Sequence, residues 1–299
     1  MQFLDPQDIS IYSAIRSSTT DNDRASLLRL LALISSTVRH FNYLEIGSDR
    51  GGSLVPLLAD PNCAAVISVD LRPAMQPDER GVDFPYPIDG EEQMMKNLRA
   101  HFDENKLKRL KTFKLDIRDV SPDLVPKIDW AFIDGEHTNT ACFSDADRVL
   151  DFVKDDAVVA FHDSTLISDA IQNFERLLTR LNIEHSTVFL PDTVAAIGIG
   201  KFSQTLAREL GSISAERSSF FAGAQLHRWL AVANSMKDQG LVQFDDTDKE
   251  REQHQLREEV AVLTAQRDEA LQIAKELRQS TSWRATAPLR SAMNFIRRR

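Results

Sequence analysis

Between residues 27 and 202, short runs of apolar and β-branched residues alternate with segments whose apolar positions recur at helical spacing. The first helical segment places five apolar residues on one stripe: Leu27, Leu30, Leu31, Ile34 and Val38. The β-like runs fall at 42–46, 64–70, 111–116, 128–134, 156–163, 186–190 and 194–200. Strands that alternate with helices are typical of a parallel sheet covered on both faces. The pattern predicts an α/β fold with a doubly wound, mostly parallel, seven-stranded, Rossmann-like sheet.

Four of these runs end in an aspartate, namely Asp70, Asp116, Asp134 and Asp163. In open α/β sheets, ligands bind beyond the carboxyl ends of the strands. Aspartate is also common in turns and at helix N-caps, which is the alternative explanation for each one taken singly. Four at corresponding positions favour a shared binding site.

The character of the chain changes after residue 202. We predict a main domain over 1–202, a helical extension and polar connector over 203–248, a short coiled coil over 249–279 and a basic tail over 280–299. The coiled coil is predicted from apolar residues spaced alternately by four and three between Leu256 and Leu277. That segment either self-associates, giving a homo-oligomer, or forms a single solvated helix.

The charge balance limits the partners of the main domain. The chain has 36 Lys and Arg residues against 45 Asp and Glu residues, a formal charge of −9. The excess acid lies in residues 1–248, because 249–299 hold 11 basic and 7 acidic residues. We therefore expect no nucleic-acid partner for the main domain. No apolar run approaches the roughly 20 residues that cross a bilayer, and no signal-peptide pattern opens the chain, so we expect a cytoplasmic protein.

The first β-like run leads into the sequence EIGSDRGGS at 45–53. Its glycine spacing is not that of a dinucleotide-binding loop, because Ser48 stands where the second glycine is required. The spacing E-x-G-x-x-x-G, followed by an acid at the end of the next strand, resembles the class I S-adenosylmethionine-dependent methyltransferases. The resemblance implies a cofactor site, and its residues would be Glu45, Gly47, Gly51, Asp70 and Asp116. A carboxylate at Asp70 suits the two hydroxyls of a ribose, since both are donors.

Two later motifs are more specific: FIDGEH at 132–137 and FHDS at 161–164. Together they resemble a subgroup of O-methyltransferases that includes the macrocin-type sugar enzymes and the cephalosporin-hydroxylase-like proteins. More distantly, they are similar to the catechol-type magnesium-dependent enzymes. The resemblance implies a divalent metal on Asp134 and Asp163, and Mg²⁺ is the ion expected before any other. It also implies that His137 is the general base. His162 stands where the sugar-methylating relatives have an acid. Either it is a ligand of a different ion, or it does not ligate, or metal binding is weak.

These resemblances imply transfer of a methyl group from S-adenosylmethionine to a hydroxyl, on a sugar of a bacterial glycan or glycoconjugate. The chemistry needs a base, because a neutral alcohol is a poor nucleophile. The long segment 71–93 contains Phe84 and Tyr86 and is expected to face the acceptor. Two alternatives stay open. One is methylation or oxidation of a small secondary metabolite, and the other is a non-catalytic assembly partner acting through the coiled coil.

The tail at 280–299 contains five Arg and no acidic residue. It resembles tails that follow coiled coils in bacterial enzymes of polysaccharide pathways. Its aromatic and apolar residues, interspersed with Arg, predict peripheral contact with the inner face of an anionic membrane. A solvated basic end is the alternative.

Overall fold

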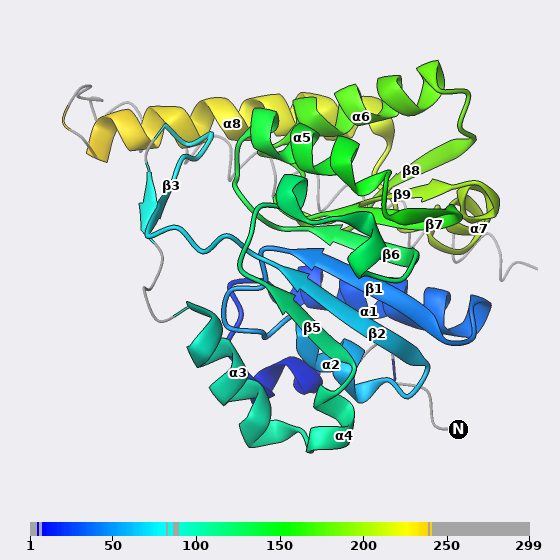
Figure 1. The fold of residues 1–299 in the computed structure, drawn as a ribbon. Coiled ribbons are helices and arrows are strands. Elements are labelled where there is room, and N and C mark those ends of the chain that lie inside the picture. Colours follow the sequence, from blue (N-terminus) through cyan, green and yellow to red (C-terminus); the bar gives the residue numbers. More distant parts are fainter. Residues whose placement is uncertain (1–4, 6–7, 82, 86–89, 239, 241–299) are drawn as a thin grey trace, which may run out of the picture. The chain divides into compact units, whose positions relative to one another are not determined.

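A computed structural model describes residues 5, 8–81, 83–85, 90–238 and 240. Its centre is a seven-stranded sheet in the order β5-β2-β1-β6-β7-β9-β8 (Figure 1). The strands are β1 (Phe41–Ile46), β2 (Cys63–Val69), β5 (Leu110–Phe113), β6 (Ile128–Ile133), β7 (Val153–Phe161), β8 (His185–Phe189) and β9 (Ala195–Ile199). The first five strands in this order pair in parallel, whereas β9 runs antiparallel to both β7 and β8. The predicted fold class is confirmed.

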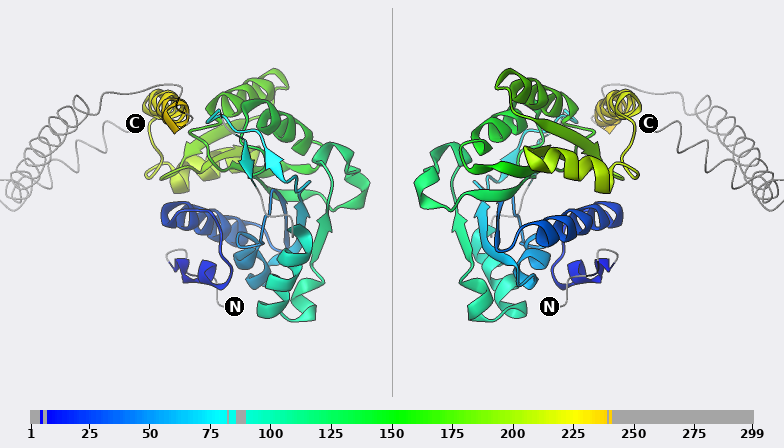
Figure 2. Two further views of the ribbon diagram at one scale, coloured as in Figure 1. Left: turned by 90° about the vertical axis from the view of Figure 1, so that its left-hand side faces the viewer. Right: turned by 90° about the vertical axis from the view of Figure 1, so that its right-hand side faces the viewer.

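Helices cover both faces of the sheet (Figures 1 and 2). One face packs against η1 (Ile9–Ala14), α1 (Asp21–Thr37), α2 (Leu54–Ala59), α3 (Gly90–His101), α4 (Glu104–Leu107) and α7 (Lys201–Leu210). The other packs against α5 (Asn139–Val149), α6 (Ser168–Arg180) and α8 (Arg217–Asp238). Every residue of β6 is buried, with Trp130 and Phe132 in one core and Ala131 and Ile133 in the other. This two-sided burial explains why the strands are continuous apolar runs.

The amino end of α1 is fixed by a reciprocal cap. The side chain of Thr20 accepts a hydrogen bond from the backbone N–H of Asp23, and the Asp23 carboxylate accepts one from the backbone N–H of Thr20. This capping box satisfies two amide groups that the first turn would leave unpaired. It also fixes the buried Asp23 carboxylate close to the carboxyl ends of the strands.

The region after residue 202 differs from the sequence pattern in one respect. The predicted helical extension contains parts of two helices, because α7 ends at Leu210 before Gly211 and α8 begins at Arg217. No helix among the described residues is long and apolar enough to cross a membrane. The predicted coiled coil and basic tail lie outside the described residues, and the predicted division into four segments stays a prediction.

Three of the four aspartates follow a strand as expected. Asp70 comes directly after β2, Asp134 directly after β6, and Asp163 two residues after β7. The prediction for Asp116 was wrong in detail, since β5 ends at Phe113. Asp116 instead caps the short helix η2 (Ile117–Asp119), where its side chain accepts a hydrogen bond from the backbone N–H of Arg118. Because β2, β1, β6 and β7 are neighbours, the other three aspartates meet at one edge of the sheet.

Candidate functional site

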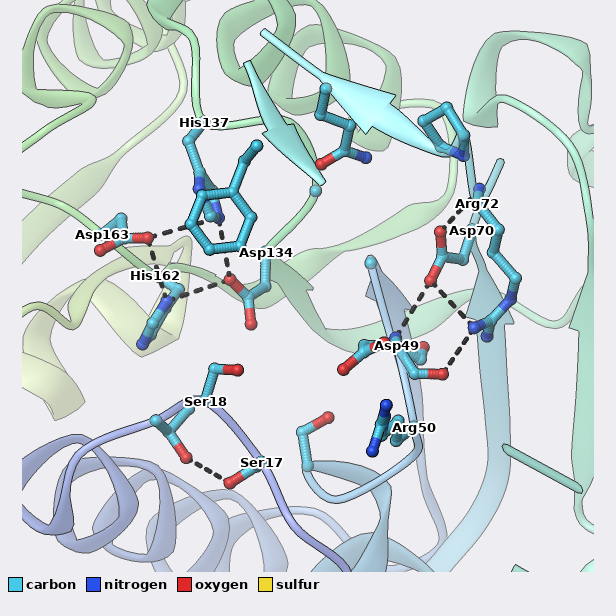
Figure 3. Close-up of a pocket in the computed structure, with 18 of the residues that line it drawn as sticks. Ser17, Ser18, Asp49, Arg50, Asp70, Arg72, Asp134, His137, His162 and Asp163 are labelled. Atoms are coloured by element: carbon cyan, nitrogen blue, oxygen red, sulfur yellow. Dashed lines mark hydrogen bonds and ion pairs between the residues drawn. The ribbon is translucent and has the colours of Figure 1, made fainter. Parts of the chain in front are cut away.

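A cavity of about 350 Å³ opens at the carboxyl ends of the parallel strands. Its walls come from residues 16–19, the loop after β1, the segment after β2, and the residues after β6 and β7 (Figure 3). A second cavity of about 340 Å³ shares Gly47, Asp70 and Gly135 with the first and reaches Asp116. Asp70 therefore stands between two adjoining spaces, which suits a ligand with two chemically different ends.

The two predicted loop glycines serve packing as well as any ligand. Gly47 has φ +88°, and a Cβ built there would lie 2.0 Å from the backbone oxygen of Asp134. The absence of a side chain thus lets the loop after β1 pass directly against the end of β6. Gly51 has φ +83°, lies outside the described lining of both cavities, and would place a Cβ 2.9 Å from Cγ of Met94. Gly51 supports the loop rather than lining the cavity.

The structure places Glu45 behind the wall of the cavity. It is fully buried and lies outside the described lining of both cavities. Its carboxyl group accepts hydrogen bonds from the hydroxyls of Tyr43 and Ser53, which ties β1 to the start of α2. Burial raises the pKa of Glu45 to about 8, so the group is uncharged at neutral pH. Its role is to hold the loop from behind.

Asp70 lines both cavities and is held in a fixed orientation. Its Oδ2 accepts a hydrogen bond of 3.0 Å from the backbone N–H of Asp49, and its Oδ1 accepts one of 3.0 Å from that of Arg72. The guanidinium of Arg72 lies 3.5 Å from Oδ2 and donates to the backbone oxygen of Asp49 (Figure 3). Each carboxylate oxygen retains capacity to accept from a ligand hydroxyl.

The loop after β1 adds two polar groups to the same wall. The buried hydroxyl of Ser48 has no hydrogen-bond partner among the described residues, although it lines the first cavity. Buried polar atoms normally have partners, so this hydroxyl is suited to a ligand. The Asp49 side chain lies in the same wall, and burial raises its pKa.

Asp116 lies in the second cavity, apart from the acids at the ends of β6 and β7. Its carboxylate pairs with the guanidinium of Arg118, and the hydrogen bond from that side chain is the main reason why the pKa of Asp116 is lowered. Asp145 of α5 lines the same cavity, and burial raises its pKa to about 7.

At the other end of the first cavity, His162 lies among three carboxylates. Its Nδ1 is 3.0 Å from Oδ1 of Asp134 and 3.6 Å from Oδ2 of Asp163 (Figure 3). Its Nε2 is 3.4 Å from Oδ2 of Asp23. Burial lowers the pKa of His162, but the carboxylates outweigh burial and raise this pKa well above 6.5. Within the described part of the chain, neither ring nitrogen has an aligned hydrogen bond. The contacts are therefore ion pairs of a protonated ring.

His137 approaches the same carboxylates from the opposite side. Its Nδ1 is 3.1 Å from Oδ2 of Asp78, and its Nε2 is 3.3 Å from Oδ2 of Asp163 and 4.0 Å from Oδ1 of Asp134. Burial lowers the pKa of His137, but the bond to Asp78 and the charges of Asp163 and Asp134 outweigh it, so the pKa is raised. These carboxylates therefore make His137 a stronger base than an ordinary histidine. Only the neutral form of its ring can accept a proton.

Asp163 is the shared partner of this cluster. Burial raises the pKa of Asp163, but His162, His137 and Arg80 outweigh burial and hold the pKa far below its ordinary value. The guanidinium of Arg80 lies 3.6 Å from Oδ1 of Asp163. The backbone of Asp163 has φ +48°, which is uncommon for a residue with a side chain. Such strain is found most often at functional sites.

The structure does not support the metal site expected on Asp134, Asp163 and His162. No group of three or more His, Cys, Asp or Glu side chains among the described residues is arranged to hold a metal ion. The physical reason lies in the partners of the two carboxylates, because the guanidinium of Arg80 and the protonated ring of His162 already lie beside them. A protonated imidazole is also not a ligand, because its lone pair carries the proton.

Several charged residues of the site were not predicted from the sequence, among them Asp78, Arg80, Asp23 and Arg72. Asp78 and Arg80 come from the segment after β2, which contains the small hairpin of β3 (Met75–Gln76) and β4 (Phe84–Pro85). Asp23 comes from α1, and Arg72 holds Asp70. The one signal that could have found Asp78 and Arg80 is their position in the segment already expected to face the acceptor. That segment does reach the cavity, since Phe84 lines it; Tyr86 lies outside the described residues.

Residues 44–164 match the model of a family described as a methyltransferase domain. The chain therefore carries a methyltransferase domain. The enzyme class expected from the loop at 45–53 and from Asp70 is thereby confirmed at the level of the domain. The match spans less than half of the chain. A search of curated proteins found no match.

Among solved structures, the chain is similar to an O-methyltransferase from Bacillus cereus in complex with SAH, at 13% identity and a TM-score of 0.46, over 66% of this chain and 93% of that one. It is also similar to the O-methyltransferase TomG from Streptomyces achromogenes, which is involved in tomaymycin synthesis and was solved in complex with SAM. There the identity is 13% and the TM-score 0.44, over 65% of this chain and 87% of that one. At these values the likenesses assign no reaction to this methyltransferase domain.

Proposed function

We propose that the protein is an S-adenosylmethionine-dependent O-methyltransferase that acts on a hydroxyl of a sugar. One observation carries the proposal. Asp70, whose carboxylate can accept hydrogen bonds from ribose hydroxyls, lines the same cavity as His137, which can act as a base. The methyltransferase-domain match supports the first part, because it covers Asp70, Asp134 and His137.

The residues around Asp70 fit S-adenosylmethionine by their chemistry. The free accepting capacity of Asp70 suits the ribose hydroxyls, and the carboxylate of Asp49 suits an ammonium group. The unpartnered hydroxyl of Ser48 suits the carboxylate of the amino-acid part. The second cavity shares Asp70 with the first and contains Asp116, so it can take the adenine of the cofactor. When bound, S-adenosylmethionine supplies a methyl group on a positively charged sulfur.

At the acceptor end, Nε2 of His137 is the group that takes the proton. The acceptor hydroxyl would give up its proton to Nε2 as its oxygen attacks. S-adenosylmethionine would supply the methyl group, and the electron pair of the broken carbon–sulfur bond would stay on sulfur in the neutral thioether that leaves. Asp163 and His162 lie side by side in the same wall, with Oδ2 of Asp163 3.3 Å from Nε2 of His137, and can orient neighbouring hydroxyls. No step passes through a metal, because the carboxylates expected to hold one have cationic partners.

The acceptor wall is suited to a polyol. Ser17, Ser18 and Thr19 line the cavity with hydroxyl groups, and Ser17 and Thr19 are 2.7 Å apart at their side-chain oxygens. The guanidinium of Arg24 donates to the hydroxyl of Ser17 and so fixes this wall. The partly exposed ring of Phe84 faces the same space and offers a surface on which a sugar ring can stack.

The test uses S-adenosylmethionine labelled in the methyl group, incubated with neutral sugars, acidic sugars and catechol as separate acceptors. We expect label in a sugar ether, and loss of at least 99% of the rate in His137→Ala, since a general base contributes about 10²- to 10⁴-fold. His227→Ala is the matched control, because His227 lies on α8 and bonds to Thr165 outside the cavity. Transfer of the label only to catechol would refute the proposal that the acceptor is a sugar. An undiminished rate in His137→Ala would refute the role of His137 as the base.

A further inference from the structure

We infer that Asp78, from the segment after β2, is the positioning residue that orients His137 for proton transfer. The inference rests on the proposed function of His137 as the base. It gives the segment after β2 a second task besides facing the acceptor, namely completing an Asp–His pair.

The geometry of the pair is specific. Oδ2 of Asp78 lies 3.1 Å from Nδ1 of His137, and the Asp78 side chain is 1% exposed against 17% for His137. A buried carboxylate beside Nδ1 keeps the proton on that nitrogen. In the neutral ring, Nε2 is then the nitrogen with a free lone pair. This nitrogen lies 3.3 Å from Oδ2 of Asp163 in the wall of the cavity, so an acceptor hydroxyl that takes the place of this contact can donate its proton to Nε2.

Asp78 is itself held in place at both oxygens. Its Oδ1 accepts a hydrogen bond of 2.8 Å from the backbone N–H of Arg80, and its Oδ2 accepts one of 2.7 Å from the Arg80 guanidinium. The adjacent Glu79 clamps the same turn onto the loop after β6. The backbone N–H of Glu79 donates to the backbone oxygen of His137 at 3.0 Å, and Oε1 of Glu79 accepts from the backbone N–H of Asn139 at 2.7 Å.

The charged groups around the His137 ring come from three parts of the chain. Asp78 and Arg80 belong to the segment after β2, Asp134 follows β6, and Asp163 follows β7. Asp134 and Asp163 lie on the Nε2 side, where the acceptor enters. Asp78 alone among them contacts Nδ1, so orientation of the ring from behind depends on this one carboxylate.

A purely structural role for Asp78 would be to pin the segment after β2. Glu79 provides the matched control for that role, because its side chain pins the same turn without touching the ring. Asp78→Asn keeps the shape of the side chain but removes its charge. Asp78→Glu restores a carboxylate, so partial recovery separates loss of charge from loss of fold.

The first readout is kinetic, measured with labelled S-adenosylmethionine and the sugar that accepts the methyl group. We expect kcat to fall at least tenfold in Asp78→Asn with KM for both substrates unchanged within about twofold, and to recover in part in Asp78→Glu. Glu79→Gln should keep kcat within about twofold of the native value. An Asp78→Asn kcat equal to the native value would overturn the inference, as would an equal loss in Glu79→Gln.

The second readout needs no methyl transfer. Proton NMR of protein labelled with ¹⁵N-histidine should show a low-field Nδ1–H resonance that disappears in His137→Gln. We expect the same resonance to be lost in Asp78→Asn and kept in Glu79→Gln. Its persistence in Asp78→Asn would overturn the pair. If no sugar is methylated, the proposed function fails while this resonance still decides whether Asp78 orients the ring.

Discussion

The buried carboxyl of Glu45 gives a prediction that is independent of the acceptor. Its pKa is raised from 4.5 to about 8, with burial as the largest cause and the charges of Asp134 and Asp70 adding to it. The native protein therefore keeps this proton between pH 4.5 and 8, where the unfolded chain has lost it. Stability must then fall as the pH rises through that window.

The size of the effect follows from the shift. Each unit of pKa corresponds to about 1.4 kcal/mol, so the shift of Glu45 amounts to about 5 kcal/mol in total. Glu45→Gln removes the titration. Its amide can donate to one of the two hydroxyls, Tyr43 or Ser53, and accept from the other. We compare the free energy of unfolding of the native protein with that of Glu45→Gln. The native value minus the variant value should decrease by up to about 5 kcal/mol between pH 4.5 and 8, and should stay constant above pH 8.

The assay is urea denaturation at half-unit steps of pH, followed by the fluorescence of the buried Trp130, whose ring lies 4.8 Å from that of Tyr43. Glu209→Gln, at the exposed end of α7, is the control for the substitution itself. A difference that stays constant from pH 4.5 to 8 would refute the argument, because Glu45 would then carry the same charge in both states.

Three further predictions concern the loop after β1 and the acid–histidine cluster. Gly47→Ala should lower the free energy of unfolding by more than about 2 kcal/mol in urea denaturation, since it combines a positive φ with a clash against Asp134; a change below about 0.5 kcal/mol would contradict the close approach. The rate of methyl transfer should rise with pH through the raised pKa of His137, because only the neutral ring accepts a proton; a rate that is flat or falling from pH 6 to 8 would argue against this base. Excess EDTA should leave activity unchanged, because Asp134 and Asp163 pair with cations; loss of activity that Mg²⁺ or Mn²⁺ restores would show that a metal is used.

The sheet and the meeting of three aspartates could be predicted from the sequence for one physical reason. Strands buried on both faces are continuous apolar runs, and their parallel arrangement aligns every carboxyl end at one edge. Asp70, Asp134 and Asp163 therefore converge whatever the details of the loops. Asp116 departs from this rule because β5 is the edge strand and ends earlier.

The partners of the histidines could not be predicted, because they come from distant parts of the chain. Asp78 and His137 are 59 residues apart, and nothing in the local pattern shows that the segment after β2 returns to the loop after β6. Asp23 has the sequence signature of a helix cap and does serve as one. Its contact with His162 depends on how α1 packs against the sheet, which local periodicity does not encode.

The metal prediction shows a different limit. Aspartate and histidine are the residue types of a metal site and also those of a network of ion pairs. The choice between the two depends on which cations stand beside the carboxylates. Arg80 is one of the cations that favour an ion-pair network here. It lies 83 residues from its partner Asp163 in the sequence, so the local pattern does not show the pairing. Glu45 shows the same limit, since the loop motif does not reveal that its acid is buried behind the loop.

The most direct test of the account is calorimetric titration of the protein with S-adenosylhomocysteine. We predict one binding site per chain, with affinity reduced at least tenfold, or about 1.4 kcal/mol, in Asp70→Ala. Asp169→Ala, whose carboxylate pairs with Arg228 on α8, should bind like the native protein. Absence of binding by the native protein, or native affinity in Asp70→Ala, would contradict the assignment of this cavity to S-adenosylmethionine.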